Sequence, residues 1–261
     1  MKSRQKINKK ISRLVGKIPF AAALYVQYKK LFSYNQFRSD IKKFNAMNDG
    51  RFMIKKSDLA PYLLDNTATT EIEPHYTYHP AWAARILAKT KPKLHIDFSS
   101  YLQFSTIVSA FIPVQFYDYR PAYLKLENLE TKKGDLLAMP FADNSVESLS
   151  CMHTVEHVGL GRYGDPIDPE GDLKAIKELK RVLAHGGTLL FVVPMGRARL
   201  LFNANRVYSY DQIMNYFSDF ILKEFSLIPD NAREIGMIKN APKELTDKQE
   251  NGCGCFWFEK K

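Results

Sequence analysis

The sequence predicts an α/β fold with a mostly parallel sheet, and three neighbouring segments lead to this prediction. Residues 145–152 form a short β-compatible run that follows the turn Asp143-Asn144. Residues 172–184 carry apolar side chains at helical spacing, and Gly186-Gly187 then indicates the end of a helix. Thr188–Val193 is an unbroken apolar run, which is typical of a strand buried on both faces. A strand, a helix and a second strand in this order form a βαβ unit with parallel strands.

Two further core strands are expected before this unit, and each ends in a carboxylate. The run at residues 93–98 contains Asp97, and the run at residues 114–117 is followed by Asp118. Ligands of open α/β sheets bind at the carboxyl ends of the strands, and acidic residues about 20 positions apart at successive strand ends suit a nucleoside cofactor. Gly134-Asp135-Leu136 has the pattern of a third strand's end. The alternative is that these aspartates only cap helices.

The remaining segments predict more helices and an antiparallel edge. We expect helices at residues 81–89, 104–110 and 210–217, and strands at residues 221–227 and 255–259. The last two strands favour an antiparallel edge on the parallel sheet. His75 and His79 precede the helix that Pro80 is expected to begin. They could be metal ligands, but their aromatic neighbours favour packing, and we expect no bound metal.

The positive charge of the chain is concentrated at one end. The formal net charge is +10, and residues 1–56 hold 15 of the 38 basic and 2 of the 28 acidic side chains. This segment is therefore at +13 and the remainder at −3. A nearly neutral body argues against nucleic acid as a partner of the main face. The three cysteines are too few for a disulfide framework and indicate a reducing compartment, so we expect a cytoplasmic protein.

The basic segment is expected to be helical. Apolar residues from Ile7 to Ile18 fall on one stripe of a helix that Pro19 closes, and residues 21–32 and 37–44 continue as two further helical pieces. A basic amphipathic helix can lie on the anionic inner face of a membrane, or it can dock on a protein. Both readings of residues 1–45 stay open. We expect two domains, a basic helical extension over residues 1–56 and an α/β domain over residues 57–261.

Three motifs in residues 75–261 resemble those of the class I S-adenosylmethionine-dependent methyltransferases. Residues 134–145, GDLLAMPFADNS, resemble the third acidic motif of that family, and residues 152–157, MHTVEH, are similar to its fourth-strand motif. Residues 178–189, ELKRVLAHGGTL, resemble its "E..RVL.PGG.L" motif. Residues 159–169, GLGRYGDPIDP, resemble an uncharacterised branch of the superfamily that is known as a domain of unknown function.

This resemblance implies a Rossmann-like sheet, S-adenosylmethionine as the cofactor, and methyl transfer to a small-molecule or glycosyl acceptor. Asp97 would orient the methionine end of the cofactor, Asp118 would accept the ribose hydroxyls, and His153 would lie near the methyl group. The complete set of implied cofactor-binding residues is Asp97, Ser99, Ser100, Asp118, Asp135, Leu136 and His153. The association of that branch with surface-polysaccharide pathways implies a sugar hydroxyl as the acceptor.

One loop departs from the family pattern. The family's first loop reads Asp/Glu-x-Gly-x-Gly, whereas this chain has Asp97-Phe-Ser-Ser-Tyr101, with Ser99 and Tyr101 in the glycine places. Glycine lets the backbone approach a ligand closely. Tyr101 must therefore point away from the ligand or reshape the pocket. A methyltransferase-like fold that serves as a binding or scaffold module remains the alternative function.

The loop at residues 159–169 is expected to cover the acceptor. Long irregular loops beside a ligand crevice are usually functional. We expect Asp165 or His157 to take the acceptor's proton, with His153 as a further catalytic candidate. The residues expected to contact the substrate are Arg162, Tyr163 and Asp168. Asp165 could instead pair with Arg162 and cap a turn.

His153-Thr-Val-Glu-His157 also matches the inverted zinc-protease motif, His-x-x-Glu-His. A zinc site of that kind needs both histidines on one helix, together with a third ligand. The expected strand end at Met152 and the glycines of the following loop leave no room for such a helix. A zinc hydrolase is therefore the third of the three functions considered.

Overall fold

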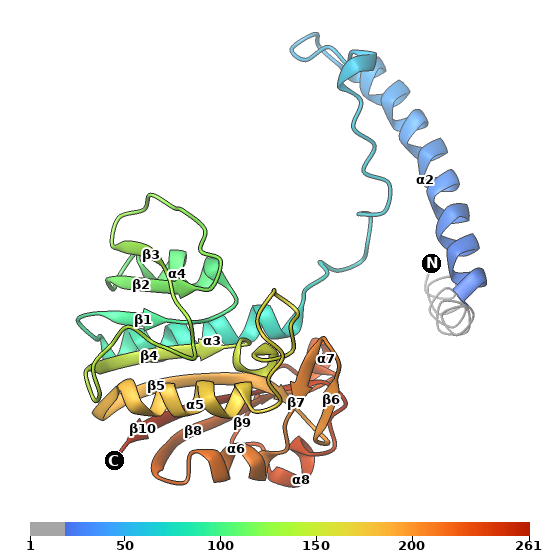
Figure 1. Ribbon diagram of the computed structural model, residues 1–261. Coiled ribbons are helices and arrows are strands. Elements are labelled where there is room, and N and C mark those ends of the chain that lie inside the picture. The colour runs from blue at the N-terminus through green and yellow to red at the C-terminus, as the bar shows by residue number, and fades with distance from the viewer. Residues whose placement is uncertain (1–18) are drawn as a thin grey trace. The chain divides into compact units, whose positions relative to one another are not determined.

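The computed structural model describes residues 19–261, and the chain divides into two compact units, Met1–Glu71 and Ile72–Lys261. In the first unit, α2 (Pro19–Met47) is one continuous helix of 29 residues (Figure 1). The prediction of two separate helical pieces was wrong, because residues 33–36 continue the helix between them. The described part of this helix starts at Pro19, and the apolar stripe predicted for residues 7–18 lies outside the described residues.

The second unit is built on an eight-stranded sheet in the order β3-β2-β1-β4-β5-β10-β8-β9. The first five strands are parallel: β1 (His95–Asp97), β2 (Val114–Asp118), β3 (Leu129–Lys133), β4 (Val146–Met152) and β5 (Leu183–Met195). β10 (Gly252–Lys260) pairs antiparallel with both β5 and β8 (Phe220–Ile228). The predicted Rossmann-like sheet with an antiparallel last strand is confirmed.

Helices cover both faces of this sheet (Figure 1). Residues of α3 (Pro74–Thr90) and α4 (Leu102–Val108) pack with the side chains of one face, and residues of α5 (Gly171–Val182) and α6 (Tyr210–Tyr216) pack with those of the other. The middle of β5 is buried on both sides, as its unbroken apolar sequence predicted. The shorter elements are η1 (Lys56–Asp58), η2 (Val155–His157), β6 (Arg199–Leu201), β7 (Asn205–Val207), α7 (Ala232–Ile235), β9 (Ile238–Lys239) and α8 (Lys243–Thr246).

Two predicted boundaries were wrong. α3 begins at Pro74 and not at Pro80, because Glu73 caps it by accepting a hydrogen bond from Tyr76 N and Pro74 supplies the favoured first residue. His75 and His79 therefore lie on the helix, four residues apart. Gly186-Gly187 lie inside β5, since α5 already ends at Val182 and the strand begins with an irregular register.

Two of the motifs are joined by side chains. Glu178 on α5 accepts a hydrogen bond from Met139 N and receives two from the Arg181 guanidinium. Arg181 also donates to the carbonyl oxygens of Met139 and Phe141. The motif at 178–189 thus fastens the segment at 134–145 to α5, which fixes the chain that leads into β4. Among residues 19–261, no helix has the length and apolar character that spanning a bilayer requires.

Candidate functional site

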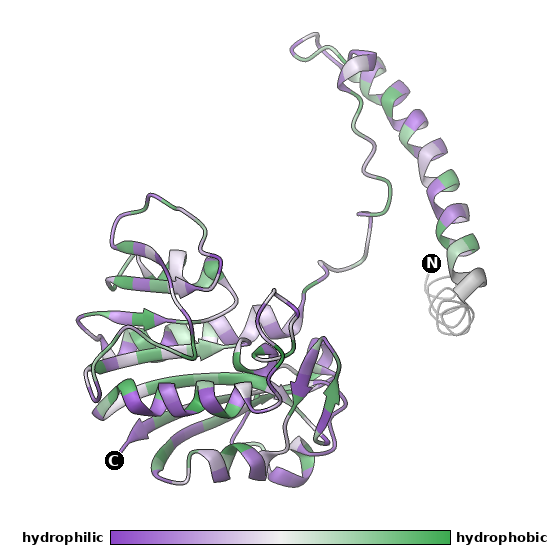
Figure 2. Cartoon of the chain, in the orientation of Figure 1, coloured by the Kyte–Doolittle hydropathy of each residue, from purple (hydrophilic) through white to green (hydrophobic). Residues whose placement is uncertain are grey.

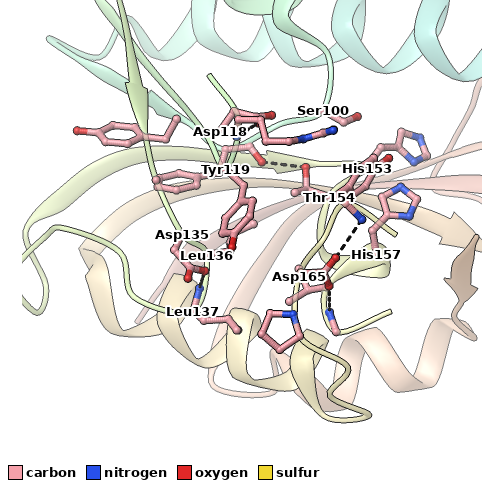
Figure 3. Close-up of a pocket in the computed structure, with 18 residues that line it drawn as sticks. Ser100, Asp118, Tyr119, Asp135, Leu136, Leu137, His153, Thr154, His157 and Asp165 are labelled. Atoms are coloured by element: carbon pink, nitrogen blue, oxygen red, sulfur yellow. Dashed lines mark hydrogen bonds between the residues drawn. The ribbon is translucent and has the colours of Figure 1, made fainter. Parts of the chain in front are cut away.

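A cavity of about 340 Å³ lies at the carboxyl ends of β1, β2, β3 and β4 (Figure 3). Its walls are made by the residues that follow these four strands and by the loop after β4. This is the position at which open parallel sheets bind ligands. The lining residues are Phe98, Ser100, Tyr117, Asp118, Tyr119, Arg120, Gly134, Asp135, Leu136, Leu137, His153, Thr154, His157, Val158, Gly159, Tyr163, Asp165 and Pro166.

Two of the predicted carboxylates lie on one side of this cavity (Figure 3). Asp118 ends β2, and its Oδ1 accepts a hydrogen bond from Arg120 N at 2.6 Å. Asp135 follows β3, and its Oδ1 accepts from Leu137 N at 2.8 Å. The second oxygen of each has no hydrogen bond to the described residues and is available to a ligand. Leu136 lies beside them and offers an apolar surface.

Asp97 is not in the cavity wall. It is fully buried, where it accepts hydrogen bonds from Ser99 N at 3.0 Å, from the Ser150 hydroxyl at 2.6 Å and from the Ser105 hydroxyl. Burial raises the pKa of Asp97, and these hydrogen bonds oppose that rise. Ser99 is buried too, and its hydroxyl accepts from Met152 N. Both residues fix the loop after β1 from behind.

The loop after β1 leaves room for a ligand although it lacks glycine. Its backbone has no positive φ angle from Asp97 to Tyr101, so no glycine is needed for its conformation. The Tyr101 ring turns towards α3, where its centre lies 5.2 Å from that of Tyr76 and 6.3 Å from that of His79. Only Ser100 of the predicted serines faces the cavity. The tyrosine in the second glycine place therefore points away.

His153 and His157 lie on the other side of the cavity and share Glu156 (Figure 3). His153 Nδ1 is 2.9 Å from Glu156 Oε1, and the His157 Nε2 is 3.9 Å from the same oxygen. His157 Nδ1 is 2.6 Å from the carbonyl oxygen of Ala204. A carbonyl only accepts, so Nδ1 carries the proton and Nε2 of neutral His157 holds a lone pair.

The HTVEH motif does not form the helix that a zinc protease requires. Residues Val155–His157 form a single 3₁₀ turn, η2, and His153 has a φ of 53° just before it. In the inverted motif, the glutamate acts as a base beside a metal held by both histidines. Here Glu156 is 1% exposed, and its hydrogen bond to His153 orients that ring.

Asp165 holds the loop at 159–169 in shape. Its carboxylate accepts hydrogen bonds from Gly159 N at 2.8 Å, Gly161 N at 3.3 Å and Tyr163 N at 3.1 Å. Burial alone would raise its pKa, but these backbone amides outweigh it and the pKa is lowered. A carboxylate with a lowered pKa is a weak base, so the alternative in which Asp165 caps a turn describes this geometry, although Arg162 is not its partner.

The other predicted substrate residues have different positions. Tyr163 lines the cavity, and its ring centre lies 4.8 Å from the Arg120 guanidinium and 5.1 Å from that of Arg162. Arg162 is outside the lining and donates to the carbonyl of Ala204 at 3.0 Å. Asp168 pairs with Lys174 at 2.6 Å and accepts from Glu170 N, so it holds the turn that precedes α5.

Two arginines that the sequence did not single out complete the site. Arg120, after β2, meets Tyr163 from the opposite loop and thereby connects two walls of the cavity. Arg206, on β7, donates to Val158 O at 2.7 Å and to Pro169 O at 3.1 Å, and it pairs with the buried Asp172 at 3.4 Å. Arg206 thus ties both ends of the loop to α5. No local sequence pattern distinguishes either arginine, because its partners are distant in the chain.

Residues 138–251 match the model of a family described as Caenorhabditis protein of unknown function, DUF268. No curated protein matches the chain. The N-methyltransferase NodS of Bradyrhizobium japonicum, solved with S-adenosylhomocysteine, is 12% identical at a TM-score of 0.49, over 77% of this chain and 91% of that one. YcgJ of Bacillus subtilis is 14% identical at a TM-score of 0.46, over 69% of this chain and 99% of that one. The [4+2]-cyclase SpnF is 12% identical at a TM-score of 0.44, over 68% of this chain and 81% of that one.

Identities this low say nothing about substrates or catalytic residues. The fold of the Ile72–Lys261 unit is a mixed α/β fold with a mostly parallel, Rossmann-like sheet, which is the architecture that the resemblance implied. The stretch from 138 to 251 includes β4, the loop over the cavity, β5 and the Arg206 anchor. The Ile72–Lys261 unit therefore has a mixed α/β fold with a Rossmann-like sheet, and residues 138–251 match a family of unknown function.

Proposed function

We propose that this protein transfers a methyl group from S-adenosylmethionine to a small-molecule or sugar hydroxyl acceptor. One observation carries the proposal. A single cavity at the carboxyl ends of four parallel strands contains free carboxylate oxygens after β2 and β3 on one side and a base-competent histidine on the other. Its volume of about 340 Å³ is within the range of small-molecule sites.

The chemistry of the lining supports this cofactor. The free oxygen of Asp118 can accept from ribose hydroxyls, and Asp135 with Leu136 can hold the polar edge and the face of adenine. The sulfonium of the cofactor supplies the methyl group, which moves by in-line displacement. The protein must then align the acceptor and remove its proton. We infer that Asp97 and Ser99 act indirectly, by holding Ser100 and the backbone of the first loop in place.

His157 is the residue best suited to take the acceptor's proton. Its Nδ1–H donates to the carbonyl of Ala204, which leaves the Nε2 lone pair for the acceptor. Glu156 Oε1, 3.9 Å from that nitrogen, would stabilise the imidazolium once it forms. Asp165 positions the loop and His153 shapes the cavity wall. Arg120 and Tyr163 offer donors and an aromatic face to a hydroxylated acceptor.

The first unit supports a second proposal, which concerns attachment. We propose that residues 1–45 hold the protein at an anionic membrane surface. Helix α2 contains five basic residues and one acidic residue, and hydrophilic and hydrophobic residues are interspersed along it (Figure 2). Several of its large apolar side chains are exposed. Cationic residues near such a surface contribute about 1 kcal/mol each. Docking on a partner protein is the competing reading.

Calorimetric titration with S-adenosylhomocysteine tests the methyltransferase proposal. We expect the wild type to bind and Asp118→Ala to lose roughly 10- to 100-fold in affinity, because charge-assisted hydrogen bonds contribute about 1.5–3 kcal/mol each before desolvation. Glu147→Ala, an exposed carboxylate at the opposite end of β4, is the matched control and should bind as the wild type does. No heat from the wild type at millimolar ligand would overturn the proposal and favour the scaffold function.

A further inference from the structure

Three potential metal ligands converge behind the wall of the cavity. His75 is the second residue of α3, His153 follows β4, and Cys253 is the second residue of β10. One ligand atom from each lies within 4.8 Å of the others, and His153 and Cys253 are buried. Cys253 is separated from His153 by 100 positions in the chain. The fold, and not any local motif, assembles this group.

The spacing is close to that of a tetrahedral zinc site. Zn–N bonds near 2.0–2.1 Å and Zn–S bonds near 2.3 Å place a ligand nitrogen and sulfur about 3.5 Å apart. Cys253 Sγ is 3.4 Å from His153 Nε2. The widest separation in the group, at most 4.8 Å, requires an adjustment of about 1 Å. The rings of His75 and His153 are stacked, with centres 5.4 Å apart and planes 6° apart, so the His75 ring must also turn to direct its lone pair at the ion. His75 is the least buried of the three, so its ring is the one with room to move.

The second ring nitrogen of His153 already has the partner that a zinc-bound histidine needs. Its Nδ1 is 2.9 Å from Glu156 Oε1, and a carboxylate there directs the lone pair of Nε2 towards Cys253. Histidine ligands of metals usually donate in this way to a carboxylate. Glu156 is 1% exposed, and its Oε2 has no hydrogen bond among the described residues. A divalent cation would balance the charges of this carboxylate and of a Cys253 thiolate.

His79 provides an independent observation. Its Nδ1 lies 2.6 Å from His75 O, which can only accept, so the lone pair is on Nε2. That nitrogen is buried and has no partner among the described residues, and the ring centre is 5.1 Å from that of His153. His79 Nε2 is thus a buried acceptor that lacks a donor, and a water molecule bound to a metal ion beside His153 could donate to it.

The arrangement Cys253–His153–Glu156 could also be read as a nucleophilic triad, but the position of the thiol argues against that reading. Cys253 is fully buried and does not line the cavity, so an electrophilic substrate has no access to it. A thiol buried in this way is inert as a nucleophile, but as a thiolate it can bind a cation.

We propose that His75, His153 and Cys253 bind a zinc ion, with a water molecule in the fourth position that donates a hydrogen bond to His79 Nε2. On binding, the S–H bond of Cys253 breaks, its proton is released to solvent, and the thiolate forms a Zn–S bond. Two imidazoles and one thiolate are ligands that zinc prefers. The ion would join α3, the end of β4 and β10, and would fix His153 at the wall of the cavity. The argument for this zinc site does not depend on whether the protein transfers methyl groups.

The test is metal content and spectroscopy of the full-length protein. Chelator-stripped protein is titrated with Zn²⁺ against a competing chromophoric chelator, and with Co²⁺ in parallel. We expect about one Zn²⁺ per chain and, with Co²⁺, a thiolate-to-cobalt charge-transfer band with the intense visible bands of a tetrahedral site. Cys253→Ser should abolish the charge-transfer band, and His75→Gln should weaken Zn²⁺ affinity at least 100-fold. Glu156→Gln should weaken it 10- to 100-fold.

Cys255→Ala is the matched control, because Cys255 is equally buried two residues along the same strand and packs in the same cluster. It should keep the zinc stoichiometry and the cobalt band. His75→Gln remains informative if the Cys253 variant does not fold, since His75 is only half-buried at the start of a helix. The proposal is overturned if the wild type binds no Zn²⁺ at micromolar concentration, or if Cys255→Ala loses the band while Cys253→Ser retains it.

Discussion

Replacing Arg206 by methionine should loosen the loop over the cavity and destabilise the Ile72–Lys261 unit. Arg206 donates to Val158 O at 2.7 Å and to Pro169 O at 3.1 Å, and its Nε is 3.4 Å from Asp172 Oδ1. The side chains of this ion pair are 12% and 7% exposed, so the variant leaves Asp172 buried with only the Tyr208 hydroxyl, at 2.9 Å, as a partner.

The expected loss is about 3–4 kcal/mol. Breaking a buried ion pair from one side costs roughly 3–5 kcal/mol, and methionine retains the apolar contacts of the arginine stem. In a domain of this size 1 kcal/mol shifts the melting temperature by about 2–4 °C, so we expect a fall of roughly 6–16 °C. Urea unfolding and thermal melting measure the loss, and S-adenosylhomocysteine affinity should fall with it because Val158 and Gly159 line the cavity.

Arg197→Met is the matched control, because Arg197 is exposed shortly before β6 and should change stability by less than about 0.5 kcal/mol. A double-mutant cycle with Asp172→Asn should give a coupling energy of about 1–3 kcal/mol. If Arg206→Met is as stable as Arg197→Met, or if the cycle shows no coupling, Arg206 does not anchor the loop.

Four further outcomes are expected. His157→Gln should reduce the rate of methyl transfer roughly 10²–10⁴-fold and leave cofactor affinity unchanged. Asp165→Asn should affect turnover chiefly through the conformation of the loop. If both variants turn over as fast as the wild type, His157 is not the base. The pKa of Asp165 is lowered in the folded protein, so its carboxylate stabilises the fold at pH values above its pKa in the unfolded chain, near 3.9. This stabilisation is lost as the pH falls through the pKa of the folded state. Asp165→Asn should therefore flatten the acid side of a plot of melting temperature against pH. Tyr101→Gly should keep S-adenosylhomocysteine affinity within about threefold of the wild type. It should lower the free energy of unfolding by roughly 1–3 kcal/mol, since the ring packs on Tyr76 and His79. Tighter binding by the variant would mean that the Tyr101 ring obstructs the pocket. The full chain should pellet with anionic vesicles at low salt and less at high salt, and Lys29→Gln/Lys30→Gln should weaken this; equal pelleting with neutral vesicles would favour docking on a protein.

The local sequence determined the strands and helices of the sheet. The apolar run at Thr188–Val193 predicted a strand buried on both faces, and the helical spacing at residues 172–184 predicted α5, because periodicity and burial are properties of short segments. Carboxylates at successive strand ends predicted the edge of the sheet at which the cavity lies. Asp118 and Asp135 lie in the cavity as that pattern indicated.

The tertiary structure decided which side chains meet. Asp97 matched the pattern as well as Asp118 did, but Ser105 and Ser150 enclose it, and no spacing within the strand reveals that burial. The turn of Tyr101 towards α3 depends on a helix whose start the sequence analysis placed six residues too late.

Long-range contacts account for the rest. Arg206 holds the loop, and Cys253 approaches His153, only because β7 and β10 return to the carboxyl end of β4. These contacts join residues that are roughly 50 to 100 positions apart in the chain. The secondary-structure propensity of a short segment therefore carries no information about such contacts. The sequence therefore determined the sheet and the edge that holds the site, whereas chain packing alone decided which residues form the cavity wall and the histidine–cysteine cluster behind it.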